Sequence, residues 1–226
     1  MEKTRLAEDL LDHLSLFQGL DQAFRKDLAH TAKQIRVEKG ACIFEKGQQA
    51  KGLYVVVTGR VKLSIPSPTK REKVIEFIGP GQAVGEAVMF MDQPYLINAH
   101  ALEDCMLLWI DKTRIVQAIE SFPHFALNVI SNLSSRFITL LHDIEVVNLQ
   151  SAHQRVAGYL LSLPSDHGMV KLNSSKGNIS SKLGLTAETF SRALQHLTHE
   201  GLIVVHASKV DILDMDRLTR VMQSGA

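Results

Sequence analysis

The sequence predicts an α+β fold, in which a β-rich N-terminal domain is followed by a long helix and a C-terminal winged helix-turn-helix. Short β-rich runs alternate with closely spaced glycines between about residues 34 and 112. Apolar residues then recur every three or four positions from residue 130 to 147. Residues 178–214 finally have the pattern helix, turn, helix, strand, turn, strand. The predicted domains are 1–123 for a β-roll with N-terminal helices, 124–148 for the long helix, and 149–226 for the winged helix.

Composition places the chain among ordinary globular proteins. Its 226 residues are 45% hydrophobic and 22% charged, enough to bury a sizeable core. The formal net charge of +1 does not by itself indicate a nucleic-acid partner, so any basic surface must be local. No apolar run approaches the roughly 20 residues of a membrane span, and the N-terminus has no secretory h-region. We therefore expect a cytoplasmic protein without a membrane partner.

Cysteine usage agrees with a reducing compartment. Cys42 and Cys105 lie in largely apolar surroundings, which predicts two buried free thiols. An iron–sulfur cluster usually needs four closely spaced cysteines, so no such cluster is expected.

The β-rich region predicts a small antiparallel sandwich, barrel or jelly roll. In "GLYVVVTGRVKLSI" two β-branched runs meet at Thr58-Gly59 and are expected to pair. The stretch "VIEFIGPGQAVGE" adds a strand and a Pro-Gly turn, and "INAHALEDCMLLWID" supplies a last pair of strands. A helix is expected after Asp111-Lys112, with a restart at Pro123.

The long helix has an apolar seam with steps of three, four, three, four and three residues, which is a heptad pattern. A narrow seam favours a two-stranded coiled coil and hence a homodimer; the alternative is a helix packed on its own domain. The apolar spacing continues to Leu163, where Pro164 ends the helix, and a hinge is expected near residues 148–151. The predicted dimer contacts are Ile130, Leu133, Phe137, Leu140, Ile144 and Val147.

The C-terminal region predicts a helix-turn-helix with a wing. The first helix is expected at Ile179–Leu183 and the turn at Gly184-Leu185. Thr186 is a good N-cap for the second helix, and Gly201 is a good residue just beyond its end. The stretch "LIVVHASKVDIL" predicts the hairpin of the wing. In such a motif the start of the second helix lies at the base edges in the DNA major groove.

Glu188, Ser191 and Arg192 share one face near the start of this second helix. An Arg reads guanine O6 and N7, a Glu accepts from the cytosine amino group, and a Ser hydroxyl serves a base or a phosphate. An i, i+4 ion pair on a solvated helix is the simpler interpretation of Glu188 and Arg192, but the surrounding motif favours DNA reading. Phe190, Leu194 and Leu197 are expected to face the core.

Further DNA contacts are expected around this motif. From Gln150 to the C-terminus there are eight Lys or Arg against six Asp or Glu, a local excess of +2. Lys176 and Lys182 flank the motif and Lys209 lies at the wing turn, which favours contacts to phosphate. Thr186 and Thr189 complete the predicted set.

At this point the chain resembles the Crp/Fnr transcription regulators over nearly its whole length. The resemblance lies in the glycine patterns "YVVVTGRVKL" and "GPGQAVGEAVMF", the long helix, and "ETFSR" at Glu188–Arg192. It implies a homodimer that binds double-stranded DNA, contacts RNA polymerase, and is gated by an effector in the β-roll. "ETFSR" is similar to the Fnr-type reading head, which implies pseudo-palindromic TTGAT-like half-sites. Ala187 stands where the Crp-type head has an additional Arg.

The resemblance also bears on the effector. Cyclic-AMP-binding members follow the Gly-Glu of the pocket with an Arg-Ser pair for the phosphate, whereas here Gly85-Glu86 is followed by "YLINAHA", so cAMP is not expected. "GEAVMFMDQPY" is similar to the dissimilatory nitrate respiration regulators (DNR), which implies a haem sensor of nitric oxide. The implied pocket residues are Gly85, Glu86, Met89, His13 and His142, with His13 and His142 as candidate iron ligands.

Three alternatives stay open at this point. The same fold can sense another small molecule, or bind DNA without an effector and use the β-roll as a scaffold. An enzyme is the third, but no clustered acid, base or nucleophile pattern supports it.

Overall fold

The computed structural model describes residues 11, 14–66 and 72–223. The chain forms two compact units, Met1–Ile138 and Thr139–Ala226, and each has its own buried apolar core. The boundary falls inside a long helix, α5 (Pro123–Leu149). Within the described ranges, no helix is both long and apolar enough to cross a bilayer.

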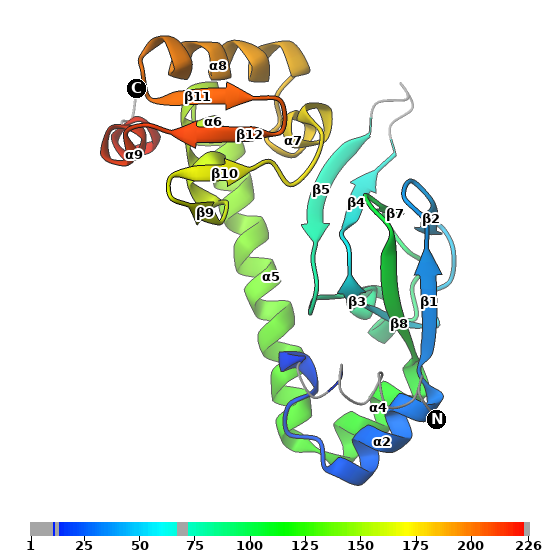
Figure 1. Ribbon diagram of the computed structural model, residues 1–226. Coiled ribbons are helices and arrows are strands. Elements are labelled where there is room, and N and C mark those ends of the chain that lie inside the picture. The colour runs from blue at the N-terminus through cyan, green and yellow to red at the C-terminus, as the bar shows by residue number, and fades with distance from the viewer. Residues whose placement is uncertain (1–10, 12–13, 67–71, 224–226) are drawn as a thin grey trace. The chain divides into compact units, whose positions relative to one another are not determined.

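The N-terminal unit contains two four-stranded antiparallel sheets, which confirms the predicted β-sandwich or roll (Figure 1). The first sheet has the order β1 (Lys33–Val37), β8 (Cys105–Asp111), β3 (Gly52–Thr58), β6 (Ala83–Val84). The second has the order β2 (Cys42–Phe44), β7 (Asn98–Ala101), β4 (Val61–Ile65), β5 (Lys73–Ile78).

The two runs of "GLYVVVTGRVKLSI" do form strands, but the predicted pairing between them is wrong. β3 pairs with β8 and β6, whereas β4 pairs with β5 and β7 in the other sheet. Gly59 makes the corner with φ +83°, and a Cβ there would lie 2.6 Å from the Cys105 Sγ. The chain therefore turns from one sheet into the other at this glycine, and the two sheets are joined into a roll.

The described helices of this unit before α5 include η1 (Ser15–Phe17), α2 (Gln22–Thr31), α3 (Glu86–Phe90) and α4 (Lys112–Ser121), and α2 and α4 lie side by side at one end of the roll (Figure 1). The predicted start of α4 is confirmed: Asp111 is its N-cap and accepts the Thr113 backbone N–H at 2.8 Å. Of the helices predicted between residues 5 and 33, residues 1–10 and 12–13 lie outside the described residues.

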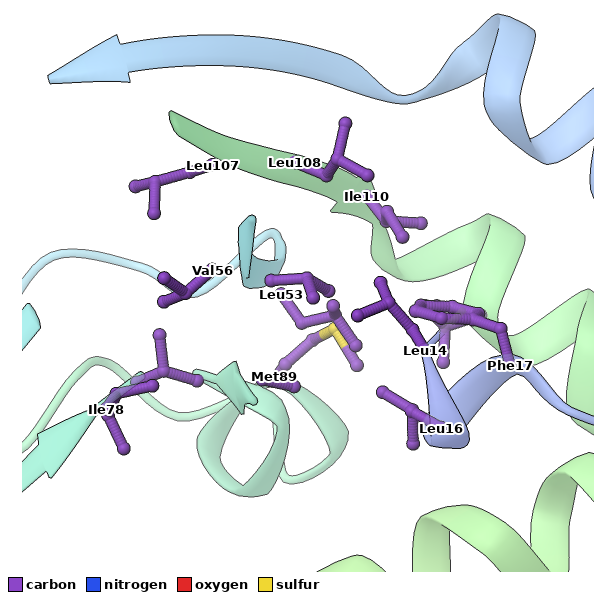
Figure 2. Packing of buried hydrophobic residues seen from close by; sticks show 14 of the residues in the cluster. Leu14, Leu16, Phe17, Leu53, Val56, Ile78, Met89, Leu107, Leu108 and Ile110 are labelled. Carbon is purple, nitrogen blue, oxygen red and sulfur yellow. The ribbon is translucent and has the colours of Figure 1, made fainter. Parts of the chain in front are cut away.

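Apolar side chains from distant segments fill the roll. Figure 2 shows Leu14, Leu16 and Phe17, from the segment around η1, in one cluster with Met89 and Leu53. Met89 and Phe17 are fully buried. The start of the described chain therefore packs into the same core as the sheets.

The two cysteines differ, and the prediction that both are buried is wrong for one of them. Cys105 is buried on the central strand β8, whereas Cys42 is exposed on the edge strand β2. Burial raises the pKa of both thiols. At Cys105, hydrogen bonds from the thiol to two backbone oxygens act in the other direction but do not cancel this rise.

The helix predicted to run on to Leu163 is interrupted. α5 ends at Leu149 and α6 (Ala152–Ser162) begins anew. Ser151 caps α6 in a reciprocal capping box: its Oγ accepts the Gln154 N–H, while Gln154 Oε1 accepts the Ser151 N–H. The break coincides with the predicted hinge at residues 148–151.

The C-terminal unit is a winged helix-turn-helix, as predicted. It comprises α6, a four-stranded sheet of order β11-β12-β10-β9, and three further helices (Figure 1). The elements are β9 (Ser165–Asp166), β10 (Met169–Lys171), α7 (Lys176–Lys182), α8 (Ala187–His199), β11 (Ile203–His206), β12 (Lys209–Ile212) and α9 (Met215–Gln223). α7 begins three residues before the predicted Ile179, because Ser175 caps it and accepts the Asn178 N–H. Neither β9 nor α9 was predicted.

Candidate functional sites

The reading helix α8 is held by a cap at its start and a core at its back. Thr186 is the N-cap, as predicted, and its Oγ1 accepts the Thr189 N–H at 3.1 Å. Phe190, Leu194 and Leu197 are buried in the core of the unit, which confirms their predicted side. The opposite face of the helix is therefore turned outward.

That outward face carries Glu188, Ser191 and Arg192, all exposed. Arg192 Nη2 donates to Glu188 Oε1 at 2.6 Å, and the two side chains are 75% and 73% exposed. The pair uses one of the five N–H donors of the guanidinium, so donors remain for a base edge. The structure thus brings together the three residues that the sequence singled out, and their chemistry suits readout in the major groove.

The three predicted phosphate contacts have different surroundings. Lys176 and Lys209 are exposed at the start of α7 and on the wing. Lys182 is only 24% exposed, and its Nζ lies 3.9 Å from Asp143 Oδ2 on α5. Lys182 is therefore engaged within its own unit, unlike the other two lysines.

The apolar stripe of α5 is broader than the predicted narrow seam. One side of the helix packs on its own domain, because Phe125 and Val129 are buried and Leu133, a predicted dimer contact, packs against the same core. Val147, another predicted contact, is partly buried. The exposed large apolar residues of α5 are Leu127, Ile130, Phe137, Ile138, Leu140, Leu141, Ile144 and Leu149.

The predicted effector pocket centres on a charged cluster that the sequence did not reveal. Gly85 has φ +99° and precedes α3, which places Glu86 on the first turn of that helix. Arg136 of α5 donates to Glu86 Oε1 at 2.6 Å, to Glu76 Oε2 at 2.8 Å and to the Ala83 carbonyl at 3.0 Å. No motif in the sequence singles out Arg136, yet it joins α5 to the second sheet and to α3.

Two carboxylates around one guanidinium leave this cluster with a formal charge of −1. Burial disfavours the charge of Arg136, but Glu86 and Glu76 outweigh it and raise the pKa of Arg136. The side chain of Glu86 is 6% exposed, and its buried Oε2 has no hydrogen-bond partner among the described residues. A cyclic phosphate is held by cationic groups, and the guanidinium here is already engaged by two carboxylates, while the expectation against cAMP stays a prediction.

Only one of the two predicted haem ligands lies among the residues that the structure describes. His13 lies outside the described residues. His142 is 69% exposed, and its Nδ1 lies 3.7 Å from Glu145 Oε2 on the same helix. Met89, the third residue named for this pocket, is fully buried among apolar side chains (Figure 2). His142 therefore does not provide the apolar surroundings that a haem ligand needs.

Comparison with known proteins agrees with this two-part architecture. Residues 34–122 match the cyclic nucleotide-binding domain family, and residues 154–221 match the Crp-like helix-turn-helix domain family. The chain is 23% identical over 220 residues to a CRP-like cAMP-activated global transcriptional regulator of Mycobacterium tuberculosis, covering 94% of this chain and 98% of the relative.

Solved structures give the same result. FixK2 from Bradyrhizobium japonicum superposes with a TM-score of 0.77 at 24% identity, over 86% of this chain and 99% of the other. DNR from Pseudomonas aeruginosa is 30% identical, with a TM-score of 0.53 over 98% of this chain and 100% of that one. With both domain families matched and this identity over nearly the full length, the chain belongs to the Crp/Fnr family of DNA-binding transcription regulators and is not an enzyme.

Proposed function

We propose that the protein is a dimeric regulator that reads pseudo-palindromic DNA with TTGAT-like half-sites through α8. The observation that carries this proposal is the exposed Glu188–Arg192 pair beside Ser191, at the capped start of a helix whose back is core. Arg192 would read a guanine and Glu188 a cytosine amino group, while Lys176 and Lys209 contact phosphate.

Dimerisation is supported by the exposed apolar stripe on α5. Scattered apolar residues are normal on a surface, but a row of Ile, Leu and Phe along one long helix marks an interaction site. A two-fold dimer would present two copies of α8 and match a palindromic site. Light scattering of Phe137→Glu against the wild type tests this: the variant is expected to be a monomer, and an unchanged dimer mass would contradict the proposal.

The DNA proposal is tested by fluorescence anisotropy with labelled duplexes. The wild type is expected to bind a palindrome of two TTGAT half-sites at least a thousandfold more tightly than a scrambled duplex at physiological salt. Arg192→Gln should remove most of that preference, whereas Lys171→Gln, at an exposed residue outside the predicted contacts, should not. Equal affinity of the wild type for both duplexes would overturn the proposed site.

We further propose that an effector bound in the N-terminal unit gates DNA binding. Arg136 links the carboxylates of the second sheet and α3 to α5, so a ligand that changes Glu86 also acts on the helix that carries the exposed stripe. An effector gates binding only if it prefers the DNA-competent state. Haem-mediated sensing of nitric oxide is our candidate, supported by the 30% identity to DNR and by the "GEAVMFMDQPY" stretch.

A haemin titration of the purified protein separates these possibilities. Near-stoichiometric binding with a Soret band that shifts on addition of nitric oxide supports haem, and His13→Ala should then abolish the band if His13 is the ligand. His142→Ala is the comparison, since its imidazole is exposed. No specific band would reject haem and leave another small molecule as the proposed effector. Operator affinity that is the same with and without haemin and nitric oxide would favour a regulator without this effector.

RNA polymerase is the remaining proposed partner, and it rests on the family resemblance. Expected behaviour is recruitment of polymerase to a promoter that carries the binding site, measured by transcription in vitro with the wild type and Arg192→Gln.

A further inference from the structure

Arg155 lies on the first turn of α6 and reaches the turn between the two helices of the helix-turn-helix. Its Nη1 donates to the Leu183 carbonyl at 2.8 Å and to the Gly184 carbonyl at 3.5 Å. Leu183 is the C-cap of α7, and Gly184, with φ +66°, starts the turn into α8. The two carbonyls thus belong to the few residues that set the angle between α7 and α8.

The physical setting favours a guanidinium at this position. The last carbonyls of a helix have no partners inside the helix and carry partial negative charge. The Gly184 N–H donates to the Ser181 carbonyl and the Leu185 N–H to the Ser180 carbonyl, so these two carbonyls at the end of α7 have backbone partners. Arg155 then supplies Nη1 from outside, held by a planar guanidinium that neither the flexible ammonium of Lys nor the shorter amide of Gln reproduces.

Arg155 is also partly withdrawn from solvent. Burial lowers its pKa, although a guanidinium stays charged at neutral pH. Its Nε is buried without a hydrogen-bond partner among the described residues. Among the described residues, the hydrogen bonds of the Arg155 side chain go to the two carbonyls of the turn, so these contacts hold the guanidinium in place.

The same turn of α6 contacts two other parts of the unit. Ser151 and Gln154 form the capping box at the break after α5. Gln154 Nε2 also lies 3.4 Å from the Met222 carbonyl of α9. Within this unit, the first turn of α6 therefore connects the break, the last helix and the helix-turn-helix turn.

We infer that Arg155 is a positioning residue for DNA reading: it fixes the turn so that α8 presents Glu188, Ser191 and Arg192 at the correct angle. This inference rests on the proposed function, because it assumes that α8 reads bases. Arg155 itself touches no base. Loss of Arg155 reduces discrimination between sequences more than it reduces attraction to DNA, because the phosphate-binding lysines stay in place.

The test first selects the preferred site of the wild-type chain from random-sequence duplexes. If the wild type selects no site, the proposed function fails independently of Arg155. Affinities of the wild type, Arg155→Gln, Arg155→Lys and the matched control Arg220→Gln are then measured for the selected and a scrambled duplex, at several salt concentrations. Titration at high protein concentration gives the active fraction of each preparation, so partial unfolding is separated from altered reading.

Arg155→Gln is expected to lose tenfold or more of the ratio of selected to scrambled affinity, with the salt dependence unchanged. Arg155→Lys keeps the charge but not the rigid, planar guanidinium, so we expect an intermediate ratio. Arg220→Gln should keep the wild-type ratio. The inference is overturned if both affinities fall by the same factor after correction for active fraction. It is also overturned if the salt slope drops by about one, which would make Arg155 a phosphate contact. Where Arg155→Gln has too little active protein, the ratio of Arg155→Lys decides: a wild-type ratio rejects the inference.

Discussion

The two units use the same residue types in opposite ways. In the N-terminal unit, Arg136 bonds Glu86 at 2.6 Å in a setting where the Glu86 side chain is 6% exposed. In the C-terminal unit, Arg192 bonds Glu188 at the same 2.6 Å, but both side chains are about three-quarters exposed. The equal distances conceal different energetics, because an exposed ion pair contributes little to stability while a buried one is costly to break. The first pair therefore supports the fold, and the second is available for recognition.

The largest expected effect comes from removing the buried cation. Arg136→Gln leaves two carboxylates without their shared partner and should lower the free energy of unfolding of the N-terminal unit by about 3 kcal/mol. We place it at the low end of the range for buried pairs because the Arg136 side chain is 25% exposed. Urea unfolding followed by the fluorescence of Trp109, the single tryptophan, reports on this unit. A change under about 1 kcal/mol would remove the contrast between the two pairs.

The exposed pair should show the reverse behaviour. Arg192→Gln is expected to change the free energy of unfolding by less than about 0.5 kcal/mol. The same substitution should weaken binding to the selected DNA site by about 1–3 kcal/mol, since the proposed bidentate contact to guanine would be lost. Urea unfolding and anisotropy titration on one preparation measure both quantities. A large loss of stability with unchanged DNA affinity would assign Arg192 to the fold instead.

A smaller loss of stability is expected when the N-cap of α8 is removed. Thr186→Ala removes the side chain that accepts the Thr189 N–H and should cost the C-terminal unit about 1 kcal/mol. Thr186→Ser keeps the hydroxyl and should retain most of that stability. Hydrogen exchange of the amides in the first turn of α8 localises the change. Equal protection in both variants would show that the cap does not hold this turn.

The smallest predicted effect concerns pH. His153 of α6 lies against His196 of α8, with ring centroids 4.4 Å apart and ring planes tilted by 42°. Burial, followed by the proximity of His196, lowers the pKa of His153 below its ordinary 6.5. The unfolded chain then takes up this proton at a higher pH than the folded one, so stability present above about pH 6.5 is lost as the pH falls.

His153→Gln should make that loss shallower in urea unfolding between pH 7.5 and 5.5. His199→Gln is the matched control on the same unit, because the His199 side chain is 89% exposed. Arg217, Arg220 and Glu200 are charged groups that line the same surface depression as His196. Identical pH profiles for wild type and His153→Gln would exclude this histidine as a source of the dependence.

Features that depend on near neighbours in the chain were predictable from sequence. The Thr186 cap, the two faces of α8 and the Asp111 cap each involve residues two to four positions apart, where helix geometry decides the contact. The Glu188–Arg192 pair belongs to the same class, with a separation of four. The reading face of the candidate site could therefore be named residue by residue.

Contacts between distant segments were not predictable in this way. Arg136 meets Glu86 and Glu76 across 50 and 60 residues, and no local pattern around it indicates these partners. Arg155 meets Leu183 across 28 residues. β3 and β4 follow one another with a glycine between them, as in a hairpin, yet each pairs in a different sheet. Alternation along a strand indicates which side is buried, but it does not identify the strand beside it.

The break between α5 and α6 has a mechanical consequence. A continuous helix resists bending because each new angle disrupts backbone hydrogen bonds, whereas here α5 is complete at Leu149 and α6 starts from its own reciprocal cap. Reorientation at Gln150 therefore puts few backbone hydrogen bonds at stake, chiefly the one from the Gln150 N–H to the Val146 carbonyl at 3.1 Å. The break therefore adds little resistance of its own to bending. The angle between α5 and α6 is set mainly by the contacts that the two helices make elsewhere. At such a break, a weakly and reversibly bound ligand suffices to favour one angle, because little free energy is needed to bend the backbone itself.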